Sequence, residues 1–336
     1  MERRRLGQSD LEIPSVTFGA WAIGGTMWGG SDDELAVAAI QAALEVGLVA
    51  IDTAPVYGFG RSERVVGRAL AGGRAKDAIV LTKAGLRWDS DDGQLAFEGP
   101  DETGTVRKIY FNSRPESVRE ECDASLARLG IERIDLFQIH WPDPTTPIAE
   151  TMGALVDLIA AGKVRAVGVS NFSPAQMTEA RDALGDVPLA SDQPKYSLVA
   201  RDIEHDVLPY AREHDVGLIV YSPIEQGLLS GKVTAARTFE ETDNRSRRPT
   251  FRPVNRALVN GVLNEVVQPI AAEHGATLAQ TVIAWTIAQP GITSAIVGAR
   301  NPEQVRENAR AAELELTASD LDAIDQAFRG LPLDVA

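Results

Sequence analysis

Four side chains of this sequence, Asp52, Tyr57, Lys83 and His140, are together suited to placing a proton on a carbonyl oxygen. A free phenol has a pKa near ~10, and a neighbouring ammonium is expected to lower that pKa by favouring the phenolate. A buried Lys83 needs a counter-ion, which Asp52 can supply. With His140 hydrogen-bonded to the substrate oxygen, Tyr57 is expected to give or take the proton. The set predicts hydride transfer to a carbonyl group, because its donors are aimed at the oxygen on which charge develops.

These residues lie at or near the ends of short apolar runs that alternate with longer segments of helical periodicity. Strands are expected over residues 16–22, 48–53, 78–83, 134–140, 164–170, 189–193, 216–221 and 294–298. Helices are expected over 32–46, 61–71, 114–129, 148–161, 174–184, 203–214, 278–289 and 302–311. This alternation predicts an α/β fold, the (β/α)8 TIM barrel, rather than two stacked domains. The carboxyl ends of the strands then converge on one mouth, which brings the four side chains together.

Local signals place the boundaries of several elements. Ser31 and Ser113 are expected to cap the first and third helices, since acidic residues follow each of them. Residues 3–14 are expected to form an N-terminal β-hairpin at the bottom of the barrel, and residues 316–328 an extra C-terminal helix that begins with a threonine cap. The glycines that follow Val46, Leu129 and Ala161 are expected to end three of the helices.

Two connections are longer than ordinary barrel loops, and both leave the carboxyl end of a strand. The segments 84–113 and 222–255 are therefore expected to be long loops over the active face. The first suggests substrate selection. The second carries NRSRRPTFR, which has four arginines, and suggests capture of an anion; a solvated mobile loop is the alternative for each.

Composition sets the broad class of the protein. The 336 residues include 33 Lys+Arg against 48 Asp+Glu, a net charge of −15 that opposes binding to nucleic acid or anionic lipid. No long apolar run indicates a membrane span or a signal peptide. The single Cys122 cannot form an internal disulfide, so a cytoplasmic location is expected, with the thiol as a small core residue on a helix. Residues 1–336 are expected to form a single barrel domain, because eight-stranded barrels of this length do not divide.

The motifs FGAWAIGG, IDTAPVYGFGRSERVVGRAL, IVLTKAG, SLARLGIERIDLFQIHWPD, LIAAGKVRAVGVSNFS, YSPIEQGLLSGK and IVGARNPEQVREN resemble those of aldo-keto reductases over nearly the whole chain. Within that family they are similar to the group of bacterial stress-related and inositol-type reductases and of voltage-gated potassium channel β-subunits. The resemblance places the catalytic tetrad on Asp52, Tyr57, Lys83 and His140. The channel subunits typically lack the histidine, so His140 favours a working reductase over a redox sensor.

The same resemblance implies a nicotinamide cofactor. Its carboxamide contacts match Ser170, Asn171 and Gln193, with Tyr221 stacked on the ring and Trp21 and Asp52 also at the cofactor. The pyrophosphate segment matches Ser222, Pro223, Ile224, Gln226, Gly227 and Lys232, and the adenosine contacts match Gly298, Arg300, Gln304, Glu307 and Asn308. Gly298 and Gln304 stand where one branch of the family has Lys and Arg, which leaves Arg300 as the expected clamp on a 2′-phosphate. NADPH (NADP+) is therefore the expected cofactor, with NADH as the alternative.

Three other chemistries are not supported. GFGRSE begins like a dinucleotide fingerprint but has Glu63 in place of the third glycine. QGLLSGKV lacks the first glycine of a P-loop and has Val233 where Ser or Thr would hold magnesium. The four histidines form neither HxH nor HExxH, so no metal is expected.

The substrate is expected to be a small-molecule aldehyde or ketone with apolar parts. Trp28, Trp88 and Trp141 are expected to contact it, with Trp21 and Phe111 also at the mouth. We expect reduction to the alcohol with Tyr57 as general acid. The alternatives are a non-catalytic nicotinamide-binding sensor that docks on another protein and an NAD-linked sugar or cyclitol dehydrogenase. The sequence names neither one carbonyl compound nor a protein partner.

Overall fold

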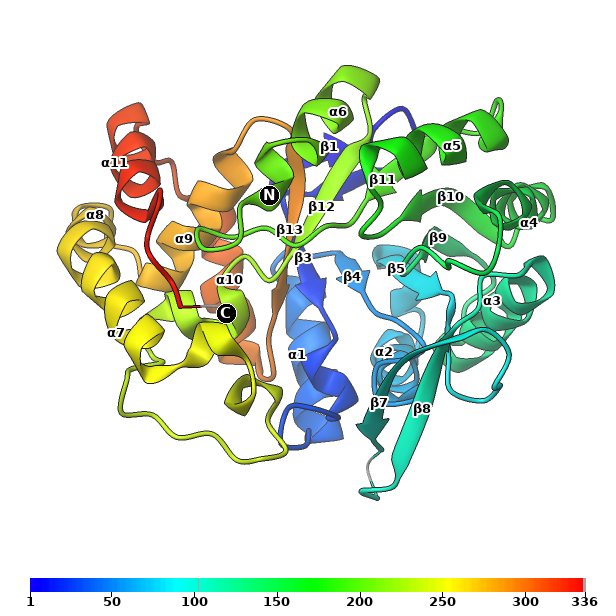
Figure 1. Ribbon diagram of the computed structural model, residues 1–336, viewed down its shortest axis with the longest axis horizontal. Coiled ribbons are helices and arrows are strands. Elements are labelled where there is room, and N and C mark those ends of the chain that lie inside the picture. The colour runs from blue at the N-terminus through cyan, green and yellow to red at the C-terminus, as the bar shows by residue number, and fades with distance from the viewer. Residues whose placement is uncertain (102, 335–336) are drawn as a thin grey trace.

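The computed structural model describes residues 1–101 and 103–334, and its centre is a closed barrel of parallel strands (Figure 1). The barrel strands are β3 (Val16–Gly19), β4 (Ala50–Asp52), β5 (Ile79–Ala84), β9 (Ile134–Ile139), β10 (Val164–Val169), β11 (Leu189–Asp192), β12 (Gly217–Tyr221) and β13 (Ile292–Gly298). They pair in that order, and β13 closes the ring by pairing with β3. The predicted (β/α)8 barrel is confirmed. Each strand begins and ends within two residues of its expected limits, except that β3 ends three residues earlier than expected.

Helices surround this barrel (Figure 1). They are α1 (Asp33–Glu45), α2 (Arg61–Leu70), α3 (Pro115–Leu129), α4 (Ile148–Ala160), α5 (Pro174–Leu184), α6 (Val207–His214), α7 (Pro253–Val262), α8 (Gln268–Glu273), α9 (Leu278–Ala288), α10 (Pro302–Arg310) and α11 (Ala318–Phe328). Short 3₁₀ turns are η1 (Ala22–Gly24), η2 (Arg74–Asp77), η3 (Asp202–Glu204), η4 (Glu225–Ser230), η5 (Asn244–Ser246), η6 (Pro249–Phe251) and η8 (Ala311–Glu313). Apolar side chains of strands and helices, including the buried Cys122 of α3, pack into one core between the two layers.

The amino-terminal hairpin closes the bottom of the barrel, as the sequence predicts. Strands β1 (Arg3–Arg5) and β2 (Glu12–Pro14) pair antiparallel. Between and beside them, Leu6, Leu11 and Ile13 are buried and pack against the barrel interior. Burying these side chains contributes roughly 1.5–3 kcal/mol each, so the hairpin seals the end of the barrel opposite to the mouth.

Both serine caps predicted from the sequence are wrong. The helix α1 starts one residue later than expected, so Asp32 rather than Ser31 accepts the amides of Glu34 and Leu35. The helix α3 also starts one residue later than expected, so Arg114 rather than Ser113 takes the N-cap position, and its side chain makes no capping hydrogen bond. The predicted threonine cap of α11 is confirmed, because Thr317 accepts the amide of Asp320 in a capping box. The glycines after α1, α3 and α4 have φ of 84°, 65° and 71°, as expected for residues that end helices.

The two long segments are more ordered than the predicted loops. Residues 84–113 contain β6 (Leu86–Arg87), β7 (Gln94–Pro100) and β8 (Val106–Phe111), which form an antiparallel sheet that we call the lid sheet. At its base, Glu121 of α3 accepts the amide of Gly85. Gly85 has φ of 97°, and an added Cβ would lie 2.7 Å from the Ser113 hydroxyl. The lid sheet is thereby fixed to the end of β5, the strand that carries Lys83.

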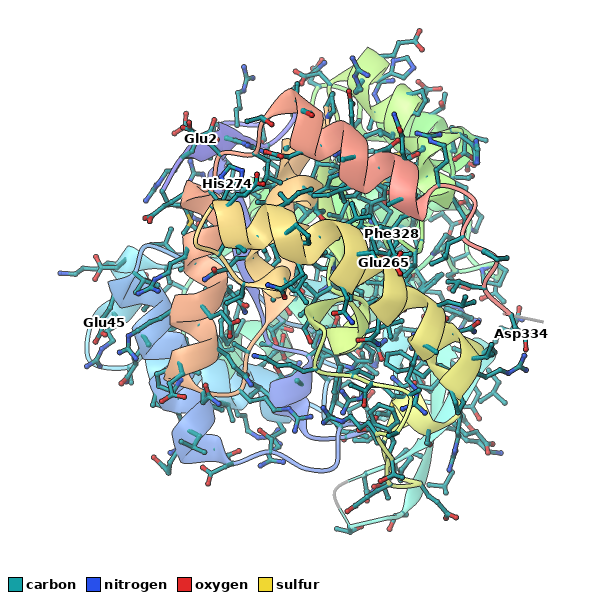
Figure 2. All side chains as sticks on the ribbon, turned by 90° about the vertical axis from the view of Figure 1, so that its left-hand side faces the viewer. Glu2, Glu45, Glu265, His274, Phe328 and Asp334 are labelled. Carbon is teal, nitrogen blue, oxygen red and sulfur yellow. The ribbon has the colours of Figure 1, made fainter. Side chains whose placement is uncertain are left out.

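The second segment continues into helix that the sequence analysis leaves unassigned. After η5 and η6 the chain forms α7, a π-helical stretch over Leu263–Val267, and α8. Pro269 has no amide to donate inside a helix, and a wider π turn directly before it accommodates the missing hydrogen bond. Figure 2 shows α11 beside the helix that α7, the π-helical stretch and α8 form together. His274, directly after α8, lies 2.9 Å from the carboxylate of Asp320 in α11. No helix among the described residues is long and apolar enough to cross a membrane.

Candidate active site

A cavity of about 550 Å³ opens at the carboxyl ends of the barrel strands. Its volume lies within the ~300–1,000 Å³ typical of small-molecule sites. The predicted residues that line it are Trp21, Trp28, Asp52, Tyr57, His140, Trp141, Ser170, Asn171, Gln193, Tyr221, Ser222, Pro223, Ile224, Gln226, Gly227, Lys232, Gly298, Arg300, Gln304, Glu307 and Asn308. The barrel therefore brings together side chains separated by more than two hundred positions in the sequence.

Lys83 lies beneath this cavity and joins the acid to the phenol. Its ammonium donates to both carboxylate oxygens of Asp52, at 2.7 and 2.9 Å, and to the carbonyl of Thr53 at 3.0 Å. The Tyr57 hydroxyl lies 3.4 Å from the same nitrogen. Lys83 is fully buried and Asp52 is 3% exposed, so this is an ion pair without solvent screening. The sequence-based expectation that Asp52 neutralises Lys83 matches this geometry.

The protonation preferences of the group follow mainly from burial. Burial raises the pKa of Tyr57 well above its usual value, and the charge of Asp52 adds a smaller increase. The predicted lowering of this pKa is therefore wrong in direction: desolvation of the phenolate outweighs the pull of Lys83. Burial also lowers the pKa of Lys83, while Asp52 opposes that shift. Tyr57 is thus held as a protonated phenol, which is the form that can donate.

His140 lies on the other side of the phenol. Its ring centroid is 5.7 Å from that of Tyr57, and the two planes are nearly perpendicular at 81°. Burial and the nearby Lys83 hold the pKa of His140 well below its usual value, so the imidazole is neutral. A neutral imidazole has one N–H donor, and here it faces the same cavity as the phenol. Two neutral donors therefore flank the position where a carbonyl oxygen would lie.

A polar cradle borders these donors. Tyr221 donates to the Asn171 side chain at 3.0 Å, and the Asn171 amide in turn donates to Ser170 at 3.0 Å. Gln193 donates its amide N–H to Asp52 at 2.8 Å. With that nitrogen held by Asp52, the Gln193 oxygen is the part of its amide able to accept from a carboxamide NH₂. Asp52 thus contacts both the cradle and Lys83.

The next stretch of the cavity suits an anion. Ser222, Glu225, Gln226 and Gly227 have φ of 58°, 43°, 51° and 93°, all in the left-handed region. Left-handed residues within a turn direct backbone N–H groups into a shared concavity that binds phosphate oxygens. Glu225 is fully buried and accepts from Lys195 at 2.8 Å, which holds this turn in place. The residues present therefore fit a pyrophosphate.

The far end of the cavity lies beside the start of α10. Arg300 donates to the carbonyl of Trp28 at 2.7 Å and lies 5.5 Å from its ring centroid. Arg245 covers the same ring at 5.5 Å, and the amide of Asn244 donates to the carbonyl of Met27. The segment with four arginines therefore crosses the cavity and meets the Met27–Trp28 turn. From it Arg248, one of the four arginines predicted to capture an anion, lines the cavity; Lys195 and Met27 also line it, and the sequence analysis singled out neither of these two.

The wall on the substrate side is apolar and aromatic. Trp21 contacts Trp28 at 5.0 Å and Tyr57 at 6.2 Å between ring centroids. Trp88 does not line the cavity; it packs against Phe59, which does. The sequence analysis missed the lid-sheet residues that do line it, namely Leu86, Phe97 and Ile109. Their apolar side chains were the available signal, but the sequence analysis predicts a loop for this segment.

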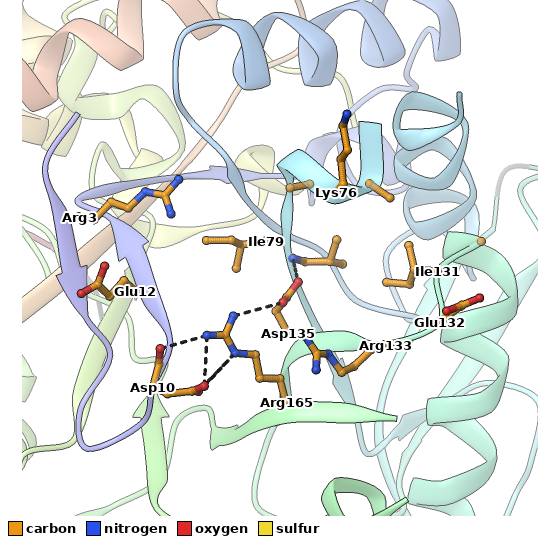
Figure 3. A pocket seen from close by; sticks show the side chains of 14 residues that line it. Arg3, Asp10, Glu12, Lys76, Ile79, Ile131, Glu132, Arg133, Asp135 and Arg165 are labelled. Atoms are coloured by element: carbon orange, nitrogen blue, oxygen red, sulfur yellow. Dashed lines mark hydrogen bonds and ion pairs between the residues drawn. The ribbon is translucent and has the colours of Figure 1, made fainter. Parts of the chain in front are cut away.

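A second cavity of about 650 Å³ lies at the opposite end of the barrel (Figure 3). Arg165 pairs there with Asp10 at 3.3 Å and lies 4.0 Å from Asp135, whose carboxylate accepts the amide of Val80. These polar groups bind one another and tie the hairpin to the barrel. The tetrad lies at the other end, so the larger volume does not mark the chemistry. No group of residues suited to hold a metal ion occurs in the described parts of the chain.

A model of the Aldo/keto reductase family matches residues 15–329. The chain belongs to the aldo/keto reductase family. It is 36% identical to aldo-keto reductase YhdN of Bacillus subtilis, with 97% of this chain and 92% of that protein covered. It is 38% identical to the NADH-specific methylglyoxal reductase of Escherichia coli, with 96% of each covered. The structure of a glycerol dehydrogenase from Gluconobacter oxydans is also similar, with a TM-score of 0.86, 40% identity and coverage of 99% and 98%.

This membership makes the chain an aldo/keto reductase-type oxidoreductase, of a family that acts on small-molecule carbonyl compounds with nicotinamide cofactors. The relatives differ in their printed activities: one is named an NADH-specific reductase, and one structural neighbour is named a dehydrogenase. Cofactor choice and direction of reaction therefore depend on the residues of this chain.

Proposed function

We propose that this protein is a single-domain reductase that converts aldehydes or ketones to alcohols with NADPH. The observation that carries the proposal is the buried Lys83, which contacts Asp52 and Tyr57 while His140 faces the same cavity. When bound, the reduced cofactor supplies a hydride to the carbonyl carbon. Every other role falls to groups of the chain itself.

Tyr57 and His140 act on the carbonyl oxygen. The neutral His140 N–H orients that oxygen and stabilises its growing negative charge. Tyr57 donates the proton that completes the alcohol, which leaves a phenolate. Lys83 stabilises the phenolate through its charge, and Asp52 keeps Lys83 charged and oriented. The high pKa of the resting phenol keeps the proton in place until charge develops on the substrate oxygen.

The proposed cofactor contacts follow the length of the cavity. Ser170, Asn171 and Gln193 bind the carboxamide, Tyr221 covers the ring, and the turn at residues 222–227 binds the pyrophosphate. Lys232, Arg300, Gln304, Glu307 and Asn308 surround the adenosine end. The 2′-phosphate is assigned to Arg300, whose guanidinium is held by Trp28 at that end. A guanidinium at this end of the cavity supports NADPH over NADH, because it can bind the 2′-phosphate.

The experiment is steady-state oxidation of NADPH with a panel of reactive aldehydes, for the wild type and for Tyr57→Phe. The variant removes only the hydroxyl, so cofactor affinity measured by fluorescence should be nearly unchanged while turnover falls by about 10²–10⁴. Tyr210→Phe is the matched control, because Tyr210 is on α6 outside the cavity, and it should keep full activity. Near-normal turnover by Tyr57→Phe would reject the role, and tight cofactor binding without wild-type turnover would instead support a sensor.

A second candidate is NAD-linked oxidation of a polyol, which the glycerol dehydrogenase and the NADH-specific reductase among the relatives favour. The aromatic wall formed by Trp21, Trp28 and Phe97 favours less polar carbonyl compounds. Comparing glycerol oxidation with NAD+ against reduction of an aromatic aldehyde with NADPH discriminates the two. A higher kcat/KM for glycerol would favour the second candidate.

A further inference from the structure

The turn that carries the carboxamide cradle is strained. Asn171 follows β10 and has φ of 63°, a left-handed conformation that a residue other than glycine rarely adopts. Its side chain donates to the carbonyl of His140 at 3.2 Å and to Ser170, and accepts from Tyr221. Such a conformation is costly and persists only where the surroundings impose it. Something next to the turn must therefore hold it.

Asp192, the last residue of β11, lies directly under this turn. It is fully buried, and one carboxyl oxygen accepts the amide of Phe172 at 3.4 Å. Backbone amides of Asn171, Phe172 and Gln193 all act to lower its pKa, but burial outweighs them and raises it to about 8. The hydrogen bond from Phe172 therefore ties the end of β11, directly before Gln193, to the turn that follows β10.

This carboxyl has no role in the tetrad. Asp192 does not line the cavity, and its second oxygen has no hydrogen-bond partner among the described residues. A buried carboxyl with an unused oxygen costs stability. An apolar side chain would avoid that cost but would leave the Phe172 amide without its acceptor. A carboxyl at this position is therefore better explained by the turn it supports than by the core in which it lies.

We propose that Asp192 is a positioning residue, which ties the end of β11 to the turn after β10 and so fixes the side chain of the next residue, Gln193, against the nicotinamide carboxamide. The inference rests on the proposed function, because it acts through that cofactor. It does not require Asp192 to touch cofactor or substrate. Its effect reaches the chemistry through the hydrogen bond of the Gln193 side chain to the carboxamide NH₂.

The test compares NADPH with its 3-acetylpyridine analogue, in which a methyl group replaces the carboxamide NH₂. Asp192→Ala removes the acceptor, and we expect it to slow single-turnover hydride transfer from NADPH at least tenfold. With the analogue, whose bond to Gln193 is already missing, the same variant should cost less than threefold. Asp192→Asn keeps an acceptor oxygen at the same place and should restore at least a third of the wild-type rate with NADPH.

Asp135→Ala is the matched control. Asp135 also accepts a strand amide, from Val80, but at the other end of the barrel, so any loss it causes should be equal for the two cofactors. Equal losses with both cofactors for Asp192→Ala would overturn the inference, because they would show a purely structural role. If Asp192→Ala does not fold, Asp192→Ser replaces it, because the shorter serine side chain does not reach the turn. Its loss of hydride-transfer rate should again be larger with NADPH than with the analogue.

The wild-type measurement separates the two levels of the argument. Absence of wild-type turnover with NADPH and with NADH would overturn the proposed function, and this inference with it. Normal wild-type turnover with equal losses in the Asp192 variants would overturn this inference alone.

Discussion

Replacing Asp52 by Asn tests the electrostatics of the site most directly. Lys83 is fully buried, and its nitrogen lies 2.7 and 2.9 Å from the two Asp52 oxygens. Asparagine keeps the shape of the side chain but leaves the ammonium without a counter-charge. Removal of one partner of a buried pair costs about 3–5 kcal/mol, so the free energy of unfolding should fall by that amount near pH 7.

The loss should depend on pH in a definite direction. Burial lowers the pKa of Lys83 from 10.5, and Asp52 is the first group that opposes the shift. Without Asp52 the folded-state pKa falls further, so between this pKa and 10.5 the unfolded chain binds more protons than the folded one. Stability then rises with pH in that window, and the variant should recover part of its deficit between pH 7 and pH 10.

Urea unfolding at pH 6, 8 and 10, combined with turnover, measures both effects. Glu63→Gln is the matched control, because Glu63 is also fully buried and pairs with Arg128 at 2.6 Å. It should destabilise the fold by a similar amount. The charge of Glu63 raises the pKa of Lys83 less than the charge of Asp52 does, and Glu63 does not line the cavity. The turnover of Glu63→Gln should therefore stay within about threefold of wild type.

Asp52→Asn should lose turnover by at least a hundredfold, since Lys83 without its counter-charge no longer stabilises the phenolate. An unfolding free energy equal to that of the wild type at pH 6 would refute the reasoning about the buried charge. Equal turnover losses in Asp52→Asn and Glu63→Gln would refute the link between that charge and catalysis.

The other predictions concern the cofactor and the lid sheet. Arg300→Ala should reduce the preference for NADPH over NADH by tenfold or more, since a charged hydrogen bond contributes about 1.5–3 kcal/mol; an unchanged ratio of dissociation constants would remove Arg300 as the phosphate ligand. Burial raises the pKa of Glu121 from 4.5 to about 8, so between these pH values Glu121 holds its proton in the folded state and loses it in the unfolded state. The free energy of unfolding of the wild type therefore falls as the pH rises through this window, by at most about 5 kcal/mol. Glu121→Gln should remove this loss, and a pH 5 to pH 9 difference in unfolding free energy equal to that of the wild type would contradict it. Phe97→Ala should raise KM for an aromatic aldehyde several-fold with little change for methylglyoxal, and equal changes would mean that the lid sheet does not contact substrate.

Much of the fold could be predicted because its signals are local. Each barrel strand is a short run of Val, Ile or Leu between segments of helical periodicity, and alternation of that kind has one common solution. Helix ends were less secure. Moving the start of α1 by one residue was enough to replace Ser31 by Asp32 as the cap. The lid sheet was missed because its strands do not alternate regularly between buried apolar and exposed polar residues: in β7 the exposed positions hold Leu95 and Phe97 as well as polar residues.

The sequence by itself determined which side chains the site contains. Residue type and place near the ends of apolar runs predict the tetrad and the side chains at residues 170, 171, 193 and 221, since in a barrel every such place opens on the same mouth. The pyrophosphate and adenosine contacts are predicted only by the resemblance to aldo-keto reductases. Only the tertiary structure decided how these groups behave. The direction of the Tyr57 pKa depends on how completely the surrounding elements exclude water, a quantity that no local pattern encodes. The hydrogen bond from the Phe172 amide to Asp192 likewise joins the ends of two strands, and it exists only once β10 and β11 lie side by side.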